Sequence, residues 1–230
     1  MSYEVVLSSA FLSAFTMPII LSFARKNRLF DSLDERKNHN GNIPRLGGVG
    51  MFAAFALMMI ALLVIQPGTV ARQLASRASK LWPLALAGML MHIIGLLDDI
   101  KPQSAKLKLT IQILAAILVV ASGYRFRSFG FRPDAMQGQL EWLSVIISLG
   151  WIVGVANAVN FIDGIDGLAG SVSFIIAIVY GIFYYKVGDP SSSLICLSIA
   201  GVIVGFLLFN FPMPNAKIFM GDSGSLFLGF

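Results

Sequence analysis

Two adjacent carboxylates, Asp98 and Asp99, follow an apolar stretch with no loop residues before them. Neighbouring carboxylates repel each other unless a cation offsets the repulsion. Mg²⁺ does this well, because it prefers oxygen ligands and commonly binds one or two carboxylates together with substrate phosphates. The pair therefore indicates a functional site. A solvated helix end is the alternative, although acids at a helix C-terminus oppose the helix dipole.

A second acidic motif, Asp163-Gly-Ile-Asp166-Gly, follows another apolar stretch. If the motif is helical, its spacing places both carboxylates on one face, and its glycines allow a phosphate or metal to approach closely. Asn157 and Asn160 precede it within otherwise apolar sequence, where polar groups are costly and usually line a cavity. A glycine-rich turn with two solvated acids is the alternative.

A third motif runs from Lys217 to Asp222 and continues Ser-Gly-Ser. Its small residues expose backbone N–H groups that can cradle an anion, but Asp222 can equally be only the N-cap of a following helix. Arg45 ends a basic loop that either holds phosphates or contacts anionic lipids. Lys108 and Gln112 lie one turn apart, where they can reach a lipid phosphate, or Lys108 can be an interfacial anchor.

The elements that must position these residues are apolar. The chain of 230 residues is 57% apolar and 13% charged, against about 25% charged residues in soluble domains. A spanning helix needs about 20 mainly apolar residues, and 109–124 is the shortest of the uncharged stretches. We predict one all-α transmembrane domain over 1–230, with seven full spans and the start of an eighth near Ser223. The seven stretches are 5–24, 46–71, 81–97, 109–124, 142–162, 167–185 and 190–216.

We expect the chain to be the N-terminal part of a longer protein, because the last carbonyls of an eighth span cut at Phe230 would lie in hydrocarbon without partners. Basic residues in loop 25–45 predict that this loop is cytoplasmic and that the N-terminus is outside. By alternation, loops 98–108, 163–166 and 210–222 share its side. The basic residues flank spans, so they give no reason to expect a nucleic-acid partner. His92, within the third span, is expected to be a packed structural residue.

The motifs resemble, in order, those of the polyprenyl-phosphate N-acetylhexosamine-1-phosphate transferases, glycosyltransferase family 4. The resemblance implies an N-out helical bundle in the bacterial inner membrane, with a Mg²⁺-dependent site on the cytoplasmic face and Mn²⁺ as a substitute. It implies that a UDP-N-acetylhexosamine and undecaprenyl phosphate give a lipid-linked pyrophosphoryl sugar and UMP, in the first membrane step of envelope polysaccharide synthesis. A homodimer is compatible with it. The matching stretches are Arg36–Gly48, Gly95–Gln112, Asn157–Gly170 and Asn210–Phe230.

The resemblance also implies roles for individual residues. The pair Asp98 and Asp99 would bind metal or deprotonate the lipid phosphate, and Asp222 would ligate the metal. The second acidic motif would bind nucleotide or metal, and Lys108 and Gln112 would lie near the lipid phosphate. The Ile-Pro-Arg-Leu-Gly-Gly form of the first loop favours the N-acetylglucosamine branch, with the phospho-N-acetylmuramoyl-pentapeptide transferases as the alternative. We count as further catalytic or substrate-binding candidates Asp163, Asp166, Asn157, Asn160, Arg45 and Lys217.

The expected reaction is a direct attack of the lipid phosphate, deprotonated or oriented by Asp98, on the β-phosphorus of the UDP-sugar. Mg²⁺ held by Asp222 and Asp99 would stabilise the departing UMP, and a covalent aspartyl-phosphate route is the alternative. One departure from the family is that no histidine-containing loop follows the third motif. The rival from another class is a cation-coupled transporter, whose acids would lie near the bilayer midplane rather than at one face.

Overall fold

The computed structural model describes residues 2–27, 29–30, 43–65, 70–126, 141–211 and 215–230. Within these ranges the chain forms helices and no strand, apart from one isolated bridge between Phe30 and Pro44. The all-α prediction is therefore confirmed. The helices are α1 (Ser2–Lys26), α2 (Gly47–Ile65), α3 (Val70–Ser76), α4 (Ala78–Ile100), α5 (Ala105–Ala121), α6 (Glu141–Ile162), α7 (Leu168–Lys186), α8 (Pro190–Asn210) and α9 (Asp222–Gly229).

Six of the described helices are long and apolar enough to cross a membrane: α1, α2, α4, α6, α7 and α8. The predicted count of seven full spans is thus one too high by this measure, because α5 has only 17 residues. It begins at Ala105, one turn earlier than its uncharged stretch, because Ser104 caps it by accepting a hydrogen bond from the N–H of Leu107. The predicted stretch 46–71 is also divided, since α2 ends at Ile65 and α3 is a separate short helix.

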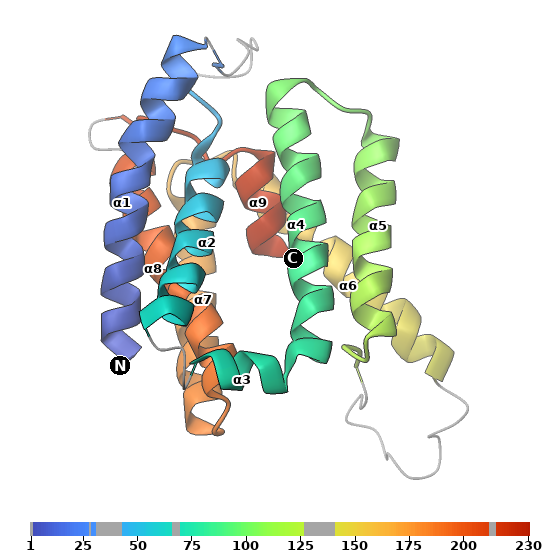
Figure 1. The fold of residues 1–230 in the computed structure, drawn as a ribbon. Coiled ribbons are helices and arrows are strands. Elements are labelled where there is room, and N and C mark those ends of the chain that lie inside the picture. The colour runs from blue at the N-terminus through green and yellow to red at the C-terminus, as the bar shows by residue number, and fades with distance from the viewer. Residues whose placement is uncertain (1, 28, 31–42, 66–69, 127–140, 212–214) are drawn as a thin grey trace.

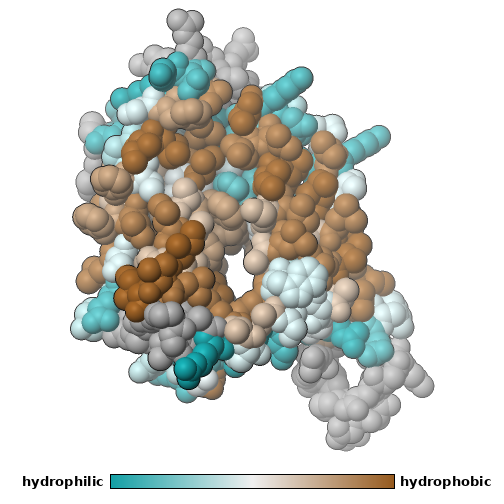
Figure 2. All heavy atoms as spheres, in the orientation of Figure 1, coloured by the Kyte–Doolittle hydropathy of each residue, from teal (hydrophilic) through white to brown (hydrophobic). Residues whose placement is uncertain are grey.

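The helices turn large apolar side chains outward, as expected of a bundle surrounded by lipid. On α1 the exposed positions recur every four residues, from Tyr3 through Leu7, Phe11 and Phe15 to Phe23. Because a helix has 3.6 residues per turn, each step of four moves the stripe by about 40°, so these side chains wind gradually around α1. Figure 2 shows apolar residues covering most of the visible middle of the molecule, with hydrophilic residues concentrated toward its two ends. This surface is the reverse of a soluble domain and supports a polytopic membrane protein.

The interior is built around α8, which packs against α1, α2 and α7. Phe206 and Ile203 of α8 are fully buried with Met17 of α1 and Met51 of α2. Small residues let α8 approach α1 closely: a Cβ added at Gly205 would lie 2.4 Å from the carbonyl oxygen of Ala10. Without a hydrophobic force between helices in lipid, such close packing is a main source of helix association.

The polar chemistry lies at the end of the bundle opposite the N-terminus (Figure 1). The last turn of α4, the start of α5, the end of α6 and the start of α9 come together there. The central prediction of the sequence, that distant acidic motifs converge on one rim of the bundle, is therefore met by the described helices.

Candidate functional site

The ammonium group of Lys108 joins two of the predicted motifs. Its Nζ lies 2.9 Å from Oδ2 of Asp222 and 3.2 Å from Oδ2 of Asp98. Both carboxylates are largely buried, with about one tenth of each side chain exposed. Charged groups of this kind inside a membrane protein are paired and mark functional sites. Asp98 also accepts a hydrogen bond from the backbone N–H of Gln103 at 2.8 Å, so the loop after α4 fixes its orientation.

Asp99 has a different environment from its neighbour. Its Oδ1 accepts a hydrogen bond from the N–H of Asp222 at 2.8 Å, and its Oδ2 accepts one from the N–H of Ser223 at 3.0 Å. The residue before α9 is Gly221, which supplies no side-chain cap. The first N–H groups of a helix lack partners within the helix, and here a carboxylate from α4 satisfies two of them. The alternative in which Asp222 serves only as an N-cap is therefore wrong.

A backbone clasp, formed by segments 43–48 and 217–222, brings Arg45 to the site. The N–H of Phe219 donates to the carbonyl of Pro44, and the N–H groups of Gly47 and Gly48 donate to the carbonyls of Phe219 and Met220. This clasp places the guanidinium of Arg45 3.9 Å from Asp222. Three other residues of the basic loop, Arg36, Lys37 and His39, lie outside the described residues.

The second acidic motif forms a turn rather than a helix. The condition under which Asp163 and Asp166 would lie on one helix face is therefore not met. The α6 helix ends at Ile162, and α7 begins at Leu168. Gly167 has a φ of +73°, a conformation that interrupts a right-handed helix and favours glycine. Asp166 is half-buried in this turn.

Asp163, the first residue of the turn, sits close to the other acids. Burial raises its pKa to about 8, and the charge of Asp99 adds to this rise, while the N–H of Gly221 and the guanidinium of Arg45 oppose it. At neutral pH its carboxyl group therefore holds a proton in the absence of a cation. A buried carboxyl group in this state is well placed to bind a cation when it loses that proton.

Asn210 joins two parts of the site, although no pattern in the sequence indicated this role. Its side chain is buried, its Oδ1 accepts from the N–H of Gly167, and its Nδ2 donates to the carbonyl of Ile218, both at 2.9 Å. It thus ties the second acidic turn to the loop that leads to Asp222. In the sequence it begins the matching stretch Asn210–Phe230 at the end of an apolar segment, seven residues before Lys217, but neither position indicates these two bonds.

The predicted asparagines both have partners. Asn157 donates to Oε1 of the buried Gln112 at 2.6 Å, so an amide pair joins α5 to α6, although Asn157 itself is exposed. Asn160 donates to the hydroxyl of Ser225 at 2.8 Å, which joins α6 to α9. These bonds position the helices around the acids, and a substrate-binding role for either asparagine stays a prediction.

His92 and Lys217 lie in contrasting environments. His92 is buried, stacks on Phe52 at a centroid distance of 4.1 Å and hydrogen-bonds through Nδ1 to the carbonyl of Ser223. This is the packed, structural environment predicted for it. Lys217 is exposed, and its side chain forms no ion pair within the described part of the chain.

The described residues contain no group of three or more His, Cys, Asp or Glu that could hold a metal ion as a complete protein cage. Mg²⁺ does not require one, since it usually takes one or two carboxylates and completes its shell with phosphate and water. The carboxyl group of Asp163 and the nearby Asp222 fit that need. The site therefore suits a cation that arrives with a phosphorylated substrate.

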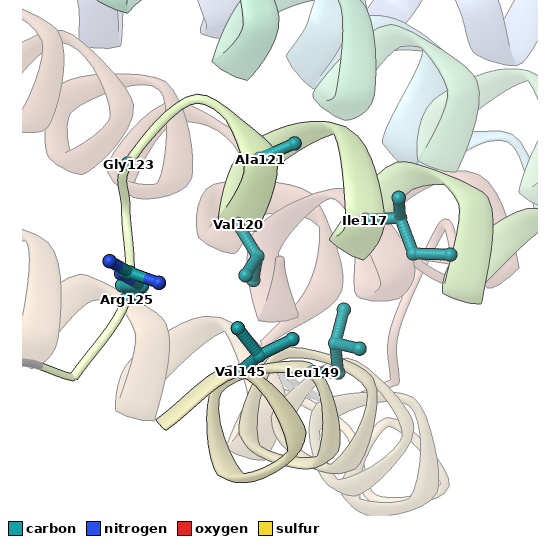
Figure 3. Close-up of a pocket in the computed structure, with 7 residues that line it drawn as sticks. All are labelled: Ile117, Val120, Ala121, Gly123, Arg125, Val145 and Leu149. Atoms are coloured by element: carbon teal, nitrogen blue, oxygen red, sulfur yellow. The ribbon is translucent and has the colours of Figure 1, made fainter. Parts of the chain in front are cut away.

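Two pockets lie away from these acids. One, of about 360 Å³, opens between α5 and α6 and is lined mostly by apolar side chains such as Ile117, Val145 and Leu149, with Arg125 at its edge (Figure 3). A larger one, of about 860 Å³, is lined by residues of several helices and reaches Phe230. None of the predicted site residues lines either pocket.

Comparison with known proteins identifies related sequences. Residues 81–230 match the sequence model of Glycosyl transferase family 4. The chain is 33% identical over 216 residues to a probable undecaprenyl-phosphate N-acetylglucosaminyl 1-phosphate transferase of Bacillus subtilis, covering 93% of this chain and 56% of that protein. It is 32% identical to an undecaprenyl-phosphate alpha-N-acetylglucosaminyl 1-phosphate transferase of Yersinia pestis, covering 100% of this chain and 60% of that protein.

A second group of relatives carries a different name. The chain is 32% identical over 231 residues to a phospho-N-acetylmuramoyl-pentapeptide-transferase of Listeria monocytogenes, covering 93% of this chain and 67% of that protein. The chain thus spans between a half and two thirds of the length of the first relatives named here.

Proposed function

Because the chain belongs to glycosyl transferase family 4, we propose that its protein transfers N-acetylglucosamine 1-phosphate from a UDP-sugar to undecaprenyl phosphate and releases UMP. The N-acetylglucosaminyl relatives support this choice of sugar. Transfer of phospho-N-acetylmuramoyl-pentapeptide is the alternative that the second group of relatives favours. The product would enter cell-envelope polysaccharide synthesis.

The observation that supports a phosphoryl transfer is the alternation of cations and carboxylates at one end of the bundle. Lys108 lies between Asp98 and Asp222, and Arg45 lies on the far side of Asp222. Phosphoryl transfer depends on positioning and on neutralising charge more than on covalent chemistry by the protein. Two cations at the site can bind the two phosphate-bearing substrates, while the carboxylates manage a proton and a metal.

In the proposed reaction an oxygen of the lipid phosphate attacks the β-phosphorus of the UDP-sugar. A new oxygen–phosphorus bond forms, the bond between the bridging oxygen and the β-phosphorus breaks, and UMP leaves with the electron pair. We assign to Asp98 the task of orienting the lipid phosphate or accepting its proton, because Asp98 is held by the N–H of Gln103 and by Lys108. Lys108 moves from the carboxylates to the incoming phosphate.

We further propose Mg²⁺ as the cofactor, held by Asp222 and Asp163. When bound, it would neutralise charge on the diphosphate and on the departing phosphate. We choose Asp163 over Asp99 because both oxygens of Asp99 already accept backbone hydrogen bonds. Asp163 must release its proton to the solvent before a cation binds, and the guanidinium of Arg45 favours that release.

We place the site at the cytoplasmic face of the bacterial inner membrane. The basic residues at the end of α1, Arg25 and Lys26, lie at the same end of the bundle as the acids, away from the N-terminus (Figure 1). Basic loops remain in the cytoplasm, where UDP-sugars are made. The acids lie at helix ends, which does not favour a transporter with a site at mid-membrane depth.

A UMP-release assay tests the proposal on the full-length protein in detergent, with undecaprenyl phosphate and a panel of UDP-sugars. We expect release with UDP-N-acetylglucosamine that requires Mg²⁺ and the lipid. A preference for UDP-N-acetylmuramoyl-pentapeptide would replace the proposed sugar by the alternative. Absence of UMP release with every donor, from protein that remains folded, would contradict the proposed reaction.

A further inference from the structure

One face of α4 forms a seat for the first turn of α9. His92, Gly95 and Asp99 are spaced by three and four residues, so they lie on the same side of the helix. All three meet the backbone of Asp222 or Ser223. These contacts fix the backbone position of Asp222 and therefore the direction of its side chain.

Each position contributes a separate kind of contact. Asp99 accepts two hydrogen bonds from the N–H groups of Asp222 and Ser223, and Nδ1 of His92 donates to the carbonyl of Ser223 at 3.0 Å. A Cβ added at Gly95 would lie 2.3 Å from the carbonyl oxygen of Asp222, so only glycine allows the two backbones to approach this closely. The seat thus binds both the N–H groups and a carbonyl group in the first turn of α9.

The loop before α9 depends on the same seat. Gly221 has a φ of +75°, and a Cβ there would lie 2.6 Å from Oδ2 of Asp99 and 2.2 Å from the carbonyl oxygen of Arg45. The chain therefore enters α9 through a space bounded by the Asp99 carboxylate. The side-chain hydrogen-bond groups that satisfy the start of α9 come from α4, more than a hundred residues earlier.

We propose that Asp99 is a positioning residue: with His92 and Gly95 it seats α9 and aims Asp222 at Lys108, while Asp98 alone of the acidic pair faces the substrates. The two adjacent acids then have separate tasks. Asp98 is paired with a side-chain cation, and Asp99 is paired with backbone N–H groups. The consequence for catalysis rests on the proposed function, but the seat itself is independent of it.

Hydrogen exchange of the full-length, metal-free protein in nanodiscs tests the seat. We expect Asp99→Asn to speed exchange at the first turn of α9 about tenfold, because an amide replaces one acceptor by a donor and a lost helix cap frees this turn. Asp98→Asn is the matched control, since it makes the same chemical change one residue away and should leave that exchange unaltered. Equal exchange in the two variants would overturn the proposal.

A second variant reaches the same turn without altering any charge. Gly95→Ala should push α9 away from α4, speed the same exchange and weaken Mn²⁺ binding, although every carboxylate is present. Gly88→Ala is its control on the same helix, because the nearest atom to a Cβ there is 3.7 Å away. If the Asp99 variant does not fold, the Gly95 pair decides alone, and normal exchange and Mn²⁺ affinity in Gly95→Ala would refute the seat.

The two proposals fail in different ways. If exchange changes as expected but wild-type protein releases no UMP from any UDP-sugar, the seat stands and the proposed function falls. If UMP is released and Asp99→Asn lowers Mn²⁺ affinity with unchanged exchange in the metal-free protein, Asp99 is a metal ligand and the seat falls.

Discussion

The interface between α1 and α8 and the seat of α9 on α4 both bring two backbones unusually close, but they are held by different forces. At the first interface, a Cβ on Gly201 would lie 2.3 Å from the carbonyl oxygen of Val6, and the buried hydroxyls of Ser9 and Ser13 have no hydrogen-bond partner among the described residues. At the second, the close approach at Gly95 is surrounded by hydrogen bonds and ion pairs.

The difference teaches that close packing alone does not mark a functional site in this bundle. The α1–α8 contact derives its stability from van der Waals packing, which tolerates no added volume and does not depend on charge. The α4–α9 contact uses directional polar groups, which are costly inside a membrane unless they are paired. Substitutions in the first region should change stability, and those in the second should change activity and cation binding.

The strongest expected effect is on activity. Asp222→Asn should lower the kcat of the full-length enzyme by about 10³, because loss of one preorganised electrostatic group at a transferring centre costs a factor of about 10² to 10³. Thermal unfolding of the same preparation should change little, as the amide keeps the size of the side chain. A variant with near-normal kcat would remove Asp222 from the proposed reaction.

The α1–α8 contact should respond in the opposite way. Gly205→Leu is expected to destabilise the fold by about 3 kcal/mol, since the new side chain would meet the backbone of Ala10 and the Cβ of Ser13. Differential scanning of the purified protein would show a lower unfolding temperature. Gly154→Leu is the control, because nothing lies within 4 Å of a Cβ there. Equal unfolding temperatures for the two variants would contradict the packing argument.

A pH dependence is expected at the site alone. The pKa of Asp163 is raised from 3.8 to about 8, chiefly by burial. The folded state therefore binds this proton more tightly than the unfolded state, so stability is lost as pH rises from about 4 to about 8 and changes no further above it. A bound cation must displace that proton, so Mn²⁺ affinity should increase about tenfold per pH unit below 8 and level off above it. Titration calorimetry at several pH values measures this slope. Asp163→Asn should abolish it, and a slope that persists in the variant would assign the proton to another group.

The smallest effect is expected at a third interface, between α5 and α6. Gln112 and Asn157 form a partly buried polar contact between these two helices without any charge. A double-mutant cycle with alanine at each position should give a coupling energy of about 0.6 kcal/mol in unfolding experiments, the size found for hydrogen bonds between helices in membranes. Coupling seen in kcat but absent from stability would instead give this pair a part in substrate binding.

The sequence predicted the bundle and the meeting of the acids because hydropathy and alternation constrain a membrane protein strongly. It could not separate the tasks of Asp98 and Asp99, since the two are chemically identical and their difference lies in which way each points from α4. The turn at Asp163 was equally hidden, because the left-handed conformation of Gly167 decides it. The predicted number of spans was too high because of α5. This helix gains one turn at its start, where Ser104 caps it, but it ends at Ala121 and has only 17 residues.

The role of Asn210 could not be read for a similar reason. An amide at a helix end is commonly a simple surface residue, and only the fold shows that it joins the turn at Gly167 to the loop at Ile218. Arg45, in contrast, was visible as a cation near glycines. Its approach to Asp222 depends on the backbone clasp, whose bonds do not involve side chains and therefore leave no pattern in the sequence.

The length of chain between Asp99 and its partners has a consequence for synthesis. Lys108 follows Asp98 by ten residues, so a nascent hairpin of α4 and α5 already contains the counter-ion of Asp98. The N–H groups that bind Asp99 are 123 and 124 residues away. Translation of that length of chain takes about 6 to 25 s. During that interval Asp99 must stay hydrated at the membrane surface or accept hydrogen bonds from another donor. The rate of translation therefore sets how long this carboxylate lacks its native partners.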